Sequence, residues 1–389
     1  MKILLVSTQD YIHHPLTSRH HYIFEELALR HEIHVPHFHV SRGKTRTTRL
    51  TVHEATLFPC ESPLLHYTLN APYQYHVFSR ILDKNDIDIV VAGHVLAGTS
   101  VITAARRRRI PVVFDLKDWL PDSAAAYYHN PGVQNAIRRG VWAITRYNLA
   151  RSTRITTVSP GLVRKLGQFG FTASLITNGV DTDRFKPLPP SIREKLGIPR
   201  DAFVLGFAGS IERWYALDTV IRTLPDILQK VPNAHILIVG GSLFTGYADE
   251  LRRVAVEAGV QDRVTFTGLV PYNDLPSYIA GMDVGLIPLS PPQWVDIALP
   301  NKFFEYSACG KPILSTPIPD MVDIGGPHLF IYRDYRQFVE LVRAIAADPH
   351  QFILDFSGYS WKKKAQEFEI LLQDVLANPL SGSSAPPMQ

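Results

Sequence analysis

The chain has 389 residues, of which 46% are hydrophobic and 20% charged. This length exceeds what one ordinary hydrophobic core holds, so two domains are expected. Two cysteines, Cys60 and Cys309, exclude a disulfide framework and a thiolate metal cluster. No apolar run approaches the ~20 residues that cross a bilayer, and residues 1–7 are typical of a first strand rather than of a signal peptide. These features favour a cytoplasmic protein.

Charge is distributed unevenly along the chain. Residues 1–185 hold 22 Lys and Arg against 14 Asp and Glu, whereas the remainder holds 18 against 22. A basic first half predicts an anionic acceptor or an anionic membrane surface, with the protein peripheral at the inner membrane face; the alternative is that this charge serves solubility alone. The run Arg106 to Arg109 follows a predicted helix without interleaved aromatic residues, which indicates a solvated helix end and no nucleic-acid partner.

Short apolar runs alternate with helical patterns in the first half, as in a doubly wound parallel sheet. The expected strands are residues 3–7, 33–36, 87–92, 112–114, 155–158 and 173–176. The expected helices are residues 18–30, 73–82, 96–107, 123–151 and 160–169, and residues 37–70 are expected to be irregular. Ligands of such sheets bind outside the carboxyl ends of the strands, which makes Lys117 and Asp118, after strand 112–114, candidates for a binding site.

The second half repeats this α/β alternation after a proline-rich linker at residues 186–190. The expected strands are residues 203–208, 234–239, 264–266, 284–287, 312–315 and 329–332, and the expected helices are 217–229, 247–258, 274–280, 301–309, 335–347 and 361–376. The predicted architecture is therefore two Rossmann-like domains facing each other across a cleft. We place the domains at residues 1–186 and 187–360, a crossover helix at 361–377 that packs on the first domain, and a disordered tail at 378–389.

The stretch from Pro300 to Pro312 carries the strongest local indication of a ligand site. A helix that begins near Asn301 would place Lys302 at its amino end, where free N–H groups and the helix dipole favour a phosphate. Glu305, one turn further on, could accept hydrogen bonds from sugar hydroxyls. The alternative is an exposed amphipathic helix with one ordinary ion pair between Lys302 and Glu305.

Two common nucleotide-dependent reactions are disfavoured by the glycine patterns. Gly206 and Gly209 lack the third glycine of a dinucleotide fingerprint, and no phosphate-binding loop with its Gly-Lys-Ser/Thr ending occurs. Hydride transfer and phosphoryl transfer are therefore not expected.

Several segments together resemble the family 4 retaining glycosyltransferases of the GT-B fold. These segments are Thr157 to Ser159, Asn178 to Asp181 with Phe185, Phe207 to Gly209 with Asp218, Phe266 to Pro271, Leu275 to Ala280, Asp283 to Pro288, Pro300 to Pro312, and Trp361 with its helix. The resemblance implies transfer of a hexose from a UDP- or GDP-linked sugar to a glycan or lipid-linked acceptor, with the anomeric configuration retained. It implies no metal and no cofactor beyond this donor substrate, in polysaccharide, glycolipid or glycan assembly.

The resemblance also implies site residues, with the nucleotide held mainly by the second domain. Glu305 would bind the ribose, Lys302 and Arg213 would neutralise the diphosphate, and Asp118 would contact the donor sugar or receive the acceptor proton. The implied catalytic residues are Asp118, Arg213 and Lys302, and the implied substrate-binding residues are Gly209, Ser210, Gly240, Gly241, Pro300, Asn301, Glu305, Arg19 and Lys117. Arg19 stands among histidines in the first loop, most of which are expected to be ordinary surface residues.

Three departures from the family pattern keep other functions open. Ser210 and Tyr215 stand where the family commonly has Arg and Lys, and Ile297 stands where its first Glu would contact the donor sugar. One alternative is a catalytically reduced GT-B protein that serves as a nucleotide-sugar-binding or complex-forming subunit. Another is a nucleotide-sugar epimerase, which would form product without an acceptor.

Overall fold

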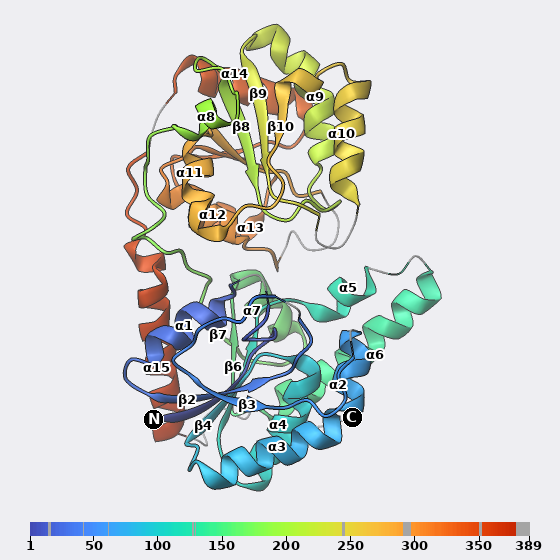
Figure 1. Ribbon diagram of the computed structural model, residues 1–389, viewed down its shortest axis with the longest axis vertical. Coiled ribbons are helices and arrows are strands. Elements are labelled where there is room, and N and C mark those ends of the chain that lie inside the picture. The colour runs from blue at the N-terminus through green and yellow to red at the C-terminus, as the bar shows by residue number, and fades with distance from the viewer. Residues whose placement is uncertain are drawn as a thin grey trace. The chain divides into compact units, whose positions relative to one another are not determined.

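The computed structural model shows two compact α/β units (Figure 1). It describes residues 1–378 except 15–16, 42, 61, 127, 129, 243–245, 291–296 and 350–351. Unit 1 comprises Met1–Asn178 together with the segment that begins at Trp361, and unit 2 comprises Gly179–Ser360. The chain thus passes from one unit to the other after Asn178 and returns after Ser360, whereas the sequence placed the first boundary at residue 186. Nearly all of the predicted tail lies outside the described residues.

Unit 1 is built on a seven-stranded sheet in which every pairing is parallel. Its order is β3-β2-β1-β4-β5-β6-β7. The strands are β1 (Lys2–Val6), β2 (Glu32–His37), β3 (Thr51–Glu54), β4 (Ile89–Ala92), β5 (Val112–Leu116), β6 (Arg154–Thr157) and β7 (Ser174–Leu175). The central strands β1, β4 and β5 are mainly apolar, with Asp115 of β5 as a buried exception, because helices cover both of their faces.

The helices of unit 1 form two groups on opposite sides of this sheet (Figure 1). They are α1 (Arg19–Leu27), α2 (Pro63–Leu69), α3 (Ala71–Lys84), α4 (Val95–Arg107), α5 (Leu120–Ala125), α6 (Pro131–Arg151), α7 (Pro160–Gln168) and α15 (Trp361–Ala377). Helix α15 packs on α1: Trp361 stacks on Tyr22 with ring centroids 4.9 Å apart, and Phe368 meets Phe24 edge-on at 5.5 Å. Helix α15 therefore completes the core of unit 1.

Unit 2 is built on a six-stranded sheet of order β10-β9-β8-β11-β12-β13, again wholly parallel. Its strands are β8 (Phe203–Ala208), β9 (Ala234–Val239), β10 (Val264–Phe266), β11 (Val284–Ile287), β12 (Ile313–Ser315) and β13 (Leu329–Ile331). Its helices are α8 (Ile192–Lys195), α9 (Leu217–Lys230), α10 (Tyr247–Glu257), α11 (Leu275–Ala280), α12 (Asn301–Ala308), α13 (Pro319–Ile324) and α14 (Tyr335–Ala347). The two predicted Rossmann-like units are confirmed.

Alternate residues of the strands feed two separate cores in unit 2. Leu205 and Phe207 of β8 pack into one core with α9, α10 and α14, whereas Val204 and Ala208 pack into the other with α11 and α12. This is the period-two alternation of a strand that is buried on both faces.

The prediction that residues 37–70 are irregular is wrong, because they contain β3 and α2. Neither element shows the usual pattern: β3 is an edge strand with mostly exposed side chains, and α2 exposes Leu64, Leu65 and Leu69. The single helix predicted at 123–151 is divided into α5 and α6, since Asn130 accepts hydrogen bonds from two amides of the first turn of α6 and Pro131 occupies its first position.

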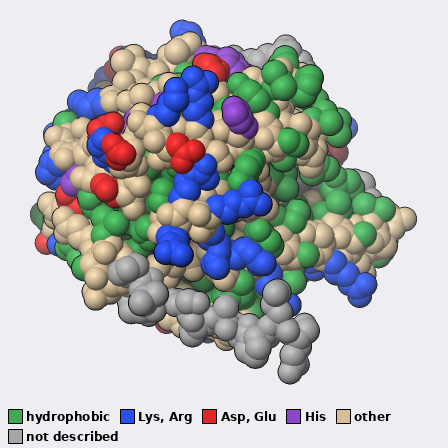
Figure 2. Space-filling model, turned by 90° about the horizontal axis from the view of Figure 1, so that it is seen from below, with side chains coloured by type: hydrophobic (Ala, Val, Ile, Leu, Met, Phe, Trp, Pro, Cys, Tyr) green, Lys and Arg blue, Asp and Glu red, His purple; other side chains and the backbone are tan. Residues whose placement is uncertain are grey.

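The basic run after α4 is engaged within unit 1. Arg108 donates two hydrogen bonds to the Asp83 carboxylate, at 2.6 and 2.7 Å, and Arg107 donates to the Tyr75 hydroxyl at 2.7 Å. Figure 2 shows Lys and Arg side chains gathered on the face seen from below. None of the described helices is long and apolar enough to span a membrane.

Both sheets have a switch point, where the strand order reverses and where ligands of such sheets bind. In unit 1 it lies between β1 and β4, and in unit 2 between β8 and β11. The loops that follow these four strands are therefore the places to look for a site.

Candidate active site

The neighbouring strands β8 and β9 are each followed by a glycine at the carboxyl edge of the unit 2 sheet. Gly209 follows β8 with φ +141°, Gly240 follows β9 with φ +132°, and the Gly209 amide donates to the Val239 carbonyl at 2.9 Å. A Cβ on Gly240 would lie 1.9 Å from the Gly209 carbonyl oxygen. Only glycine fits both the backbone angles and this approach, so the chain exposes bare backbone at the switch point.

Lys302 points into the same place from the first turn of α12. A Cβ on Gly209 would lie 3.2 Å from the Lys302 Nζ, which itself lies over the rings of Tyr215, at 3.5 Å, and Phe207, at 4.1 Å. Lys302 is only 6% exposed, and no carboxylate in the described part of the chain forms an ion pair with it. Burial lowers the pKa of this ammonium well below its usual range, although Glu305 opposes the shift.

Glu305 lies one turn along α12 and is also buried, at 8% exposure. The Tyr272 hydroxyl donates to its Oε1 at 3.0 Å. Burial raises the pKa of Glu305, whereas this hydrogen bond and Lys302 oppose that rise. The alternative of an exposed ion pair between Lys302 and Glu305 is therefore wrong: both charges are buried, beside a helix amino end formed by Pro300 and Asn301.

The remaining predicted residues of unit 2 fall into two groups. Ser210 and Gly241 belong to the same edge, since the Ile211 amide donates to the Gly241 carbonyl at 3.0 Å and Ser210 Oγ donates to Glu212 at 2.9 Å. Arg213 is different: it is exposed and forms a bidentate ion pair with Glu250. Its predicted contact with a diphosphate stays a prediction.

Unit 1 holds a cavity of ≈ 710 Å³ at its own switch point. It is lined mainly by apolar side chains of α2, α4, α5 and α6 and by the loops after β1, β4 and β5. The lining residues are Thr8, Gln9, Pro63, Leu64, Tyr67, Gly93, His94, Val95, Leu96, Leu116, Lys117, Asp118, Leu120, Ala124, Tyr128, Ala136, Ile137, Gly140, Val141 and Ile144. Lys117 and Asp118, both predicted as site residues, thus line the cavity. Burial lowers the pKa of Lys117 to about 8, and the charge of Asp118 opposes the shift.

Arg19 is not among the residues that line this cavity. Its Nε lies 3.3 Å from Asp115, and its Nη1 donates to the Ile176 carbonyl at 2.9 Å. Burial alone would raise the pKa of Asp115, but the Arg19 charge and the hydrogen bond with His20, at 2.8 Å, hold it well below its usual range. The neighbouring His20 and His21 are buried, so the surface reading of these histidines is wrong.

The side chains that surround Lys302 and Glu305 were not predicted from the sequence. Tyr215 stood out in the sequence only as a departure from the family pattern, and Tyr272 did not stand out at all. The Tyr215 ring contacts the Lys302 ammonium, and the Tyr272 hydroxyl donates a hydrogen bond to Glu305. In unit 1, Thr8 Oγ1 and Gln9 Oε1 line the cavity and are buried with no hydrogen-bond partner in the described structure. Their position directly after β1, at the switch point, was the available signal.

Comparison with protein families places both halves of the chain in one group. Residues 202–348 match the family described as "Glycosyl transferases group 1", and residues 21–184 match "Glycosyltransferase Family 4". A GDP-mannose-dependent alpha-(1-6)-phosphatidylinositol monomannoside mannosyltransferase of Mycolicibacterium smegmatis is 34% identical over 154 residues, which is 38% of this chain and 39% of the relative. The match thus spans about two fifths of that relative's length.

A second relative aligns over more of the chain. The D-inositol 3-phosphate glycosyltransferase 1 of Catenulispora acidiphila is 24% identical over 309 residues, which is 72% of this chain and 70% of the relative. Among solved structures, a sucrose-phosphate synthase from Thermosynechococcus elongatus has a TM-score of 0.76 at 17% identity and covers 97% of this chain and 99% of its own. Anabaena HepE in complex with UDP has a TM-score of 0.68 at 18% identity and covers 98% and 100%. The predicted fold class is confirmed.

Proposed function

Because the chain belongs to the family 4 glycosyltransferases of the GT-B fold, we propose that it transfers a hexose from a GDP- or UDP-linked donor to a lipid-linked acceptor, in glycolipid or glycan assembly. Two relatives, one named as GDP-mannose-dependent and both named for reactions on inositol compounds, support this class of reaction. The solved structure of Anabaena HepE with UDP supports nucleotide binding on this fold.

The observation that carries the proposal is the environment of Lys302. A buried ammonium without a carboxylate partner is costly, and proteins keep such groups mainly at functional sites. Here the ammonium lies over two aromatic rings, stands 3.2 Å from the place that a Cβ on Gly209 would take, and belongs to the first turn of α12. Such an arrangement suits a diphosphate, which brings the missing negative charge and accepts hydrogen bonds from free N–H groups.

The proposed chemistry needs stabilisation of the leaving diphosphate. When the bond between the anomeric carbon and the phosphate oxygen breaks, negative charge grows on that oxygen, and a preorganised cation lowers the barrier. We propose that Lys302 and the amino end of α12 supply this stabilisation in place of a metal ion; retention of the anomeric configuration is proposed from the resemblance to the family 4 retaining enzymes alone. Glu305, with Oε1 bound by Tyr272, keeps Oε2 for a ribose hydroxyl.

The cavity of unit 1 is the proposed acceptor site. Its apolar lining suits the acyl part of a lipid, whereas Lys117, Thr8 and Gln9 offer polar atoms for a phosphate and sugar hydroxyls. Asp118, at the same edge, would receive the acceptor proton. Exposed Leu64, on α2 beside the cavity, would meet a membrane surface, so we place the protein peripherally on the cytoplasmic side of a membrane.

Two measurements test the proposal. Titration calorimetry with GDP and UDP should show binding by the wild-type chain and loss of binding by Lys302→Met, whereas Lys230→Met, a change at an exposed lysine of the same unit, should bind normally. A transfer assay with GDP-mannose or UDP-glucose and phosphatidylinositol vesicles should show product that depends on the acceptor. Absence of nucleotide binding by the wild-type chain would refute the proposal.

The ion pair between Arg213 and Glu250 favours a second candidate function. If Arg213 stays on Glu250, Lys302 is the only predicted side-chain cation left for the diphosphate. A protein that binds a nucleotide sugar within a complex, but does not transfer the sugar, needs no second cation. Nucleotide binding without turnover, tested against a panel of donors and lipid acceptors, would favour this candidate over the enzyme.

A further inference from the structure

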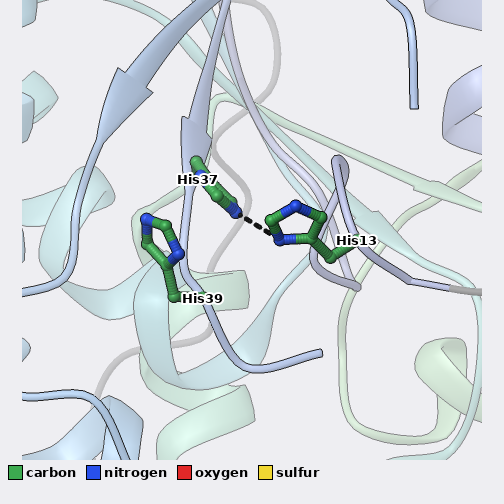
Figure 3. A group of neighbouring side chains, drawn as sticks. All are labelled: His13, His37 and His39. Carbon is green, nitrogen blue, oxygen red and sulfur yellow. Dashed lines mark hydrogen bonds between the residues drawn. The ribbon is translucent and has the colours of Figure 1, made fainter. Parts of the chain in front are cut away.

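Three histidine rings converge in unit 1 at the carboxyl end of β2. His37 is the last residue of β2, His39 follows two positions later, and His13 comes from the loop after β1. One potential ligand nitrogen of each ring lies within 4.8 Å of the other two, and Figure 3 shows the three rings grouped together. His37 is buried, His13 half-buried and His39 exposed, so the group opens to solvent on one side.

Each ring has one nitrogen bound by a neighbouring oxygen. His37 Nδ1 lies 3.2 Å from Glu54 Oε1, His39 Nε2 is hydrogen-bonded to Glu54 Oε2, and His13 Nε2 lies 3.1 Å from Thr45 Oγ1. The nitrogens that can face a metal ion are then His13 Nδ1, His37 Nε2 and His39 Nδ1. His37 Nε2 lies 3.0 Å from His13 Nδ1 and 3.8 Å from the Asp10 carboxylate. Partners of this kind fix ring orientation and tautomer in metal sites, where the outer nitrogen commonly donates to a carboxylate.

The two segments that carry the histidines are held together by one buried carboxylate. Asp10 Oδ1 accepts from the amides of Ile12 and His13, at 3.1 and 3.2 Å, and Oδ2 accepts from those of Val40 and Ser41, both at 3.2 Å. These four bonds fix the loop after β1 against the segment after β2. The backbone segments that carry the three histidines are therefore held in place by the fold.

We propose that His13, His37 and His39 bind a zinc ion, with Glu54 as the carboxylate that orients two of the rings. Neutral imidazole is a preferred ligand of zinc, and three such ligands with a water molecule complete a tetrahedral site. Zinc–nitrogen bonds of about 2.0–2.1 Å place the ligand nitrogens about 3.4 Å apart. His13 and His37 are already near this spacing, and the exposed His39 ring is free to close the remaining distance.

A second pair of histidines lies nearby on β2 and β3, without a third histidine beside it among the described residues. His34 Nδ1 and His53 Nε2 lie 2.8 Å apart on β2 and β3, so the two rings there share one hydrogen bond. In the described structure no third histidine or carboxylate completes a three-ligand group around this pair. It supplies a matched control with the same residue type, the same strands and a similar ring separation.

The ion would stabilise a wall of the cavity at the switch point of unit 1. Thr8 and Gln9, which line that cavity, lie in the same loop as His13, a few residues earlier. Zinc would tie this loop to the ends of β2 and β3 in addition to the bonds of Asp10. The site is structural, and it takes no part in the chemistry proposed for Lys302.

The test is direct metal binding by the full chain after treatment with a chelator and removal of the chelator. Titration calorimetry with zinc chloride should show one equivalent bound by the wild-type chain. His39→Ala and, separately, His13→Ala should weaken the affinity by at least about 100-fold, since even loss of an outer partner costs 10- to 100-fold. His53→Ala should bind zinc as the wild-type chain does. Bound cobalt, used as a spectroscopic substitute, should show visible absorption bands that both ligand variants lose.

Three results would overturn the proposal. The first is no stoichiometric zinc binding by the wild-type chain, in which case the rings only share hydrogen bonds. The second is wild-type affinity in His39→Ala, whose side chain is exposed and whose fold can be checked by circular dichroism. The third is an equal loss of affinity in His53→Ala, which would indicate scattered binding to surface histidines.

Discussion

Replacing Lys302 by Met tests two effects of its buried ammonium: the loss of folding stability that burial causes, and the nucleotide binding proposed for it. Met is unbranched and of similar length, so it can occupy the same space between Phe207 and Tyr215. Two effects of opposite sign are expected. Unit 2 should become more stable in the absence of nucleotide, and binding of the nucleoside diphosphate should be lost.

The size of the stability effect follows from two opposing contributions. Burial of an ammonium costs several kcal/mol after relaxation of the protein. Contacts with two aromatic rings recover about 2 kcal/mol each when the cation is desolvated. The balance leaves about 1–2 kcal/mol unfavourable, which for a unit of this size corresponds to a melting temperature about 2–8 °C higher in Lys302→Met.

The pH dependence has a definite sign. Burial lowers the pKa of Lys302 in the folded chain, so between that value and the ordinary lysine pKa the unfolded chain binds more protons. Stability therefore rises with pH across this window, and Lys302→Met abolishes the rise. A diphosphate raises the pKa of Lys302, so nucleotide binding takes up a proton and weakens as the pH rises above the lowered value.

Differential scanning fluorimetry with and without GDP or UDP measures both effects. The wild-type chain should melt at a higher temperature with nucleotide, since a ligand that binds only the folded state stabilises it. Lys302→Met should start higher and show no nucleotide shift, and its transfer rate should fall at least ~100-fold. A lower melting temperature together with an unchanged nucleotide shift would refute the argument, because Lys302 would then be a structural cation.

Three further changes test the other parts of the proposed site. Glu305→Gln should weaken nucleotide binding about tenfold, because an amide is a poorer acceptor for ribose hydroxyls than a carboxylate; an unchanged dissociation constant in calorimetry would remove Glu305 from the ribose site. Lys117→Met should raise the KM for a phospholipid acceptor by about tenfold without changing nucleotide affinity, and an unchanged KM would exclude Lys117 from acceptor binding. EDTA should leave the initial transfer rate within about twofold, and it should lower the melting temperature by removing the zinc ion proposed for unit 1. A loss of transfer rate that is restored by magnesium or manganese would contradict metal-independent transfer.

The elements that the sequence predicted well are those whose signal is local. Strands such as Phe203–Ala208 and Ala234–Val239 are mainly apolar runs that are each followed by a glycine, and α12 begins after a proline and ends before Gly310. The parallel pairing of the strands then follows from the alternation of strands and helices, because parallel strands need crossover helices. The placing of Lys302 at a helix amino end needed no tertiary information.

What the sequence could not provide are contacts between residues distant along the chain. Tyr215 meets Lys302 across 87 positions of the sequence, and the side chain of Tyr272 reaches Glu305 from a short helix that no apolar pattern predicts. The histidine group needed β2 and the first loop to lie side by side before His13 and His37 could meet. Arg213, in contrast, was predicted to bind the diphosphate, and its ion pair was not predicted because its partner, Glu250, is distant along the sequence.

Two cations of the chain are buried to nearly the same extent and differ in what surrounds them. Arg19 is 4% exposed and Lys302 is 6% exposed, but Arg19 has Asp115 at 3.3 Å, whereas Lys302 has no carboxylate partner among the described residues. Breaking a buried pair by removing one partner costs about 3–5 kcal/mol, because the other charge stays buried alone. Arg19→Met should therefore lower the melting temperature by about 6–20 °C, opposite in sign to Lys302→Met. If Arg19→Met instead left stability unchanged and abolished acceptor binding, Arg19 would be a substrate residue after all, and a missing ion-pair partner would no longer distinguish a ligand-binding cation from a structural one.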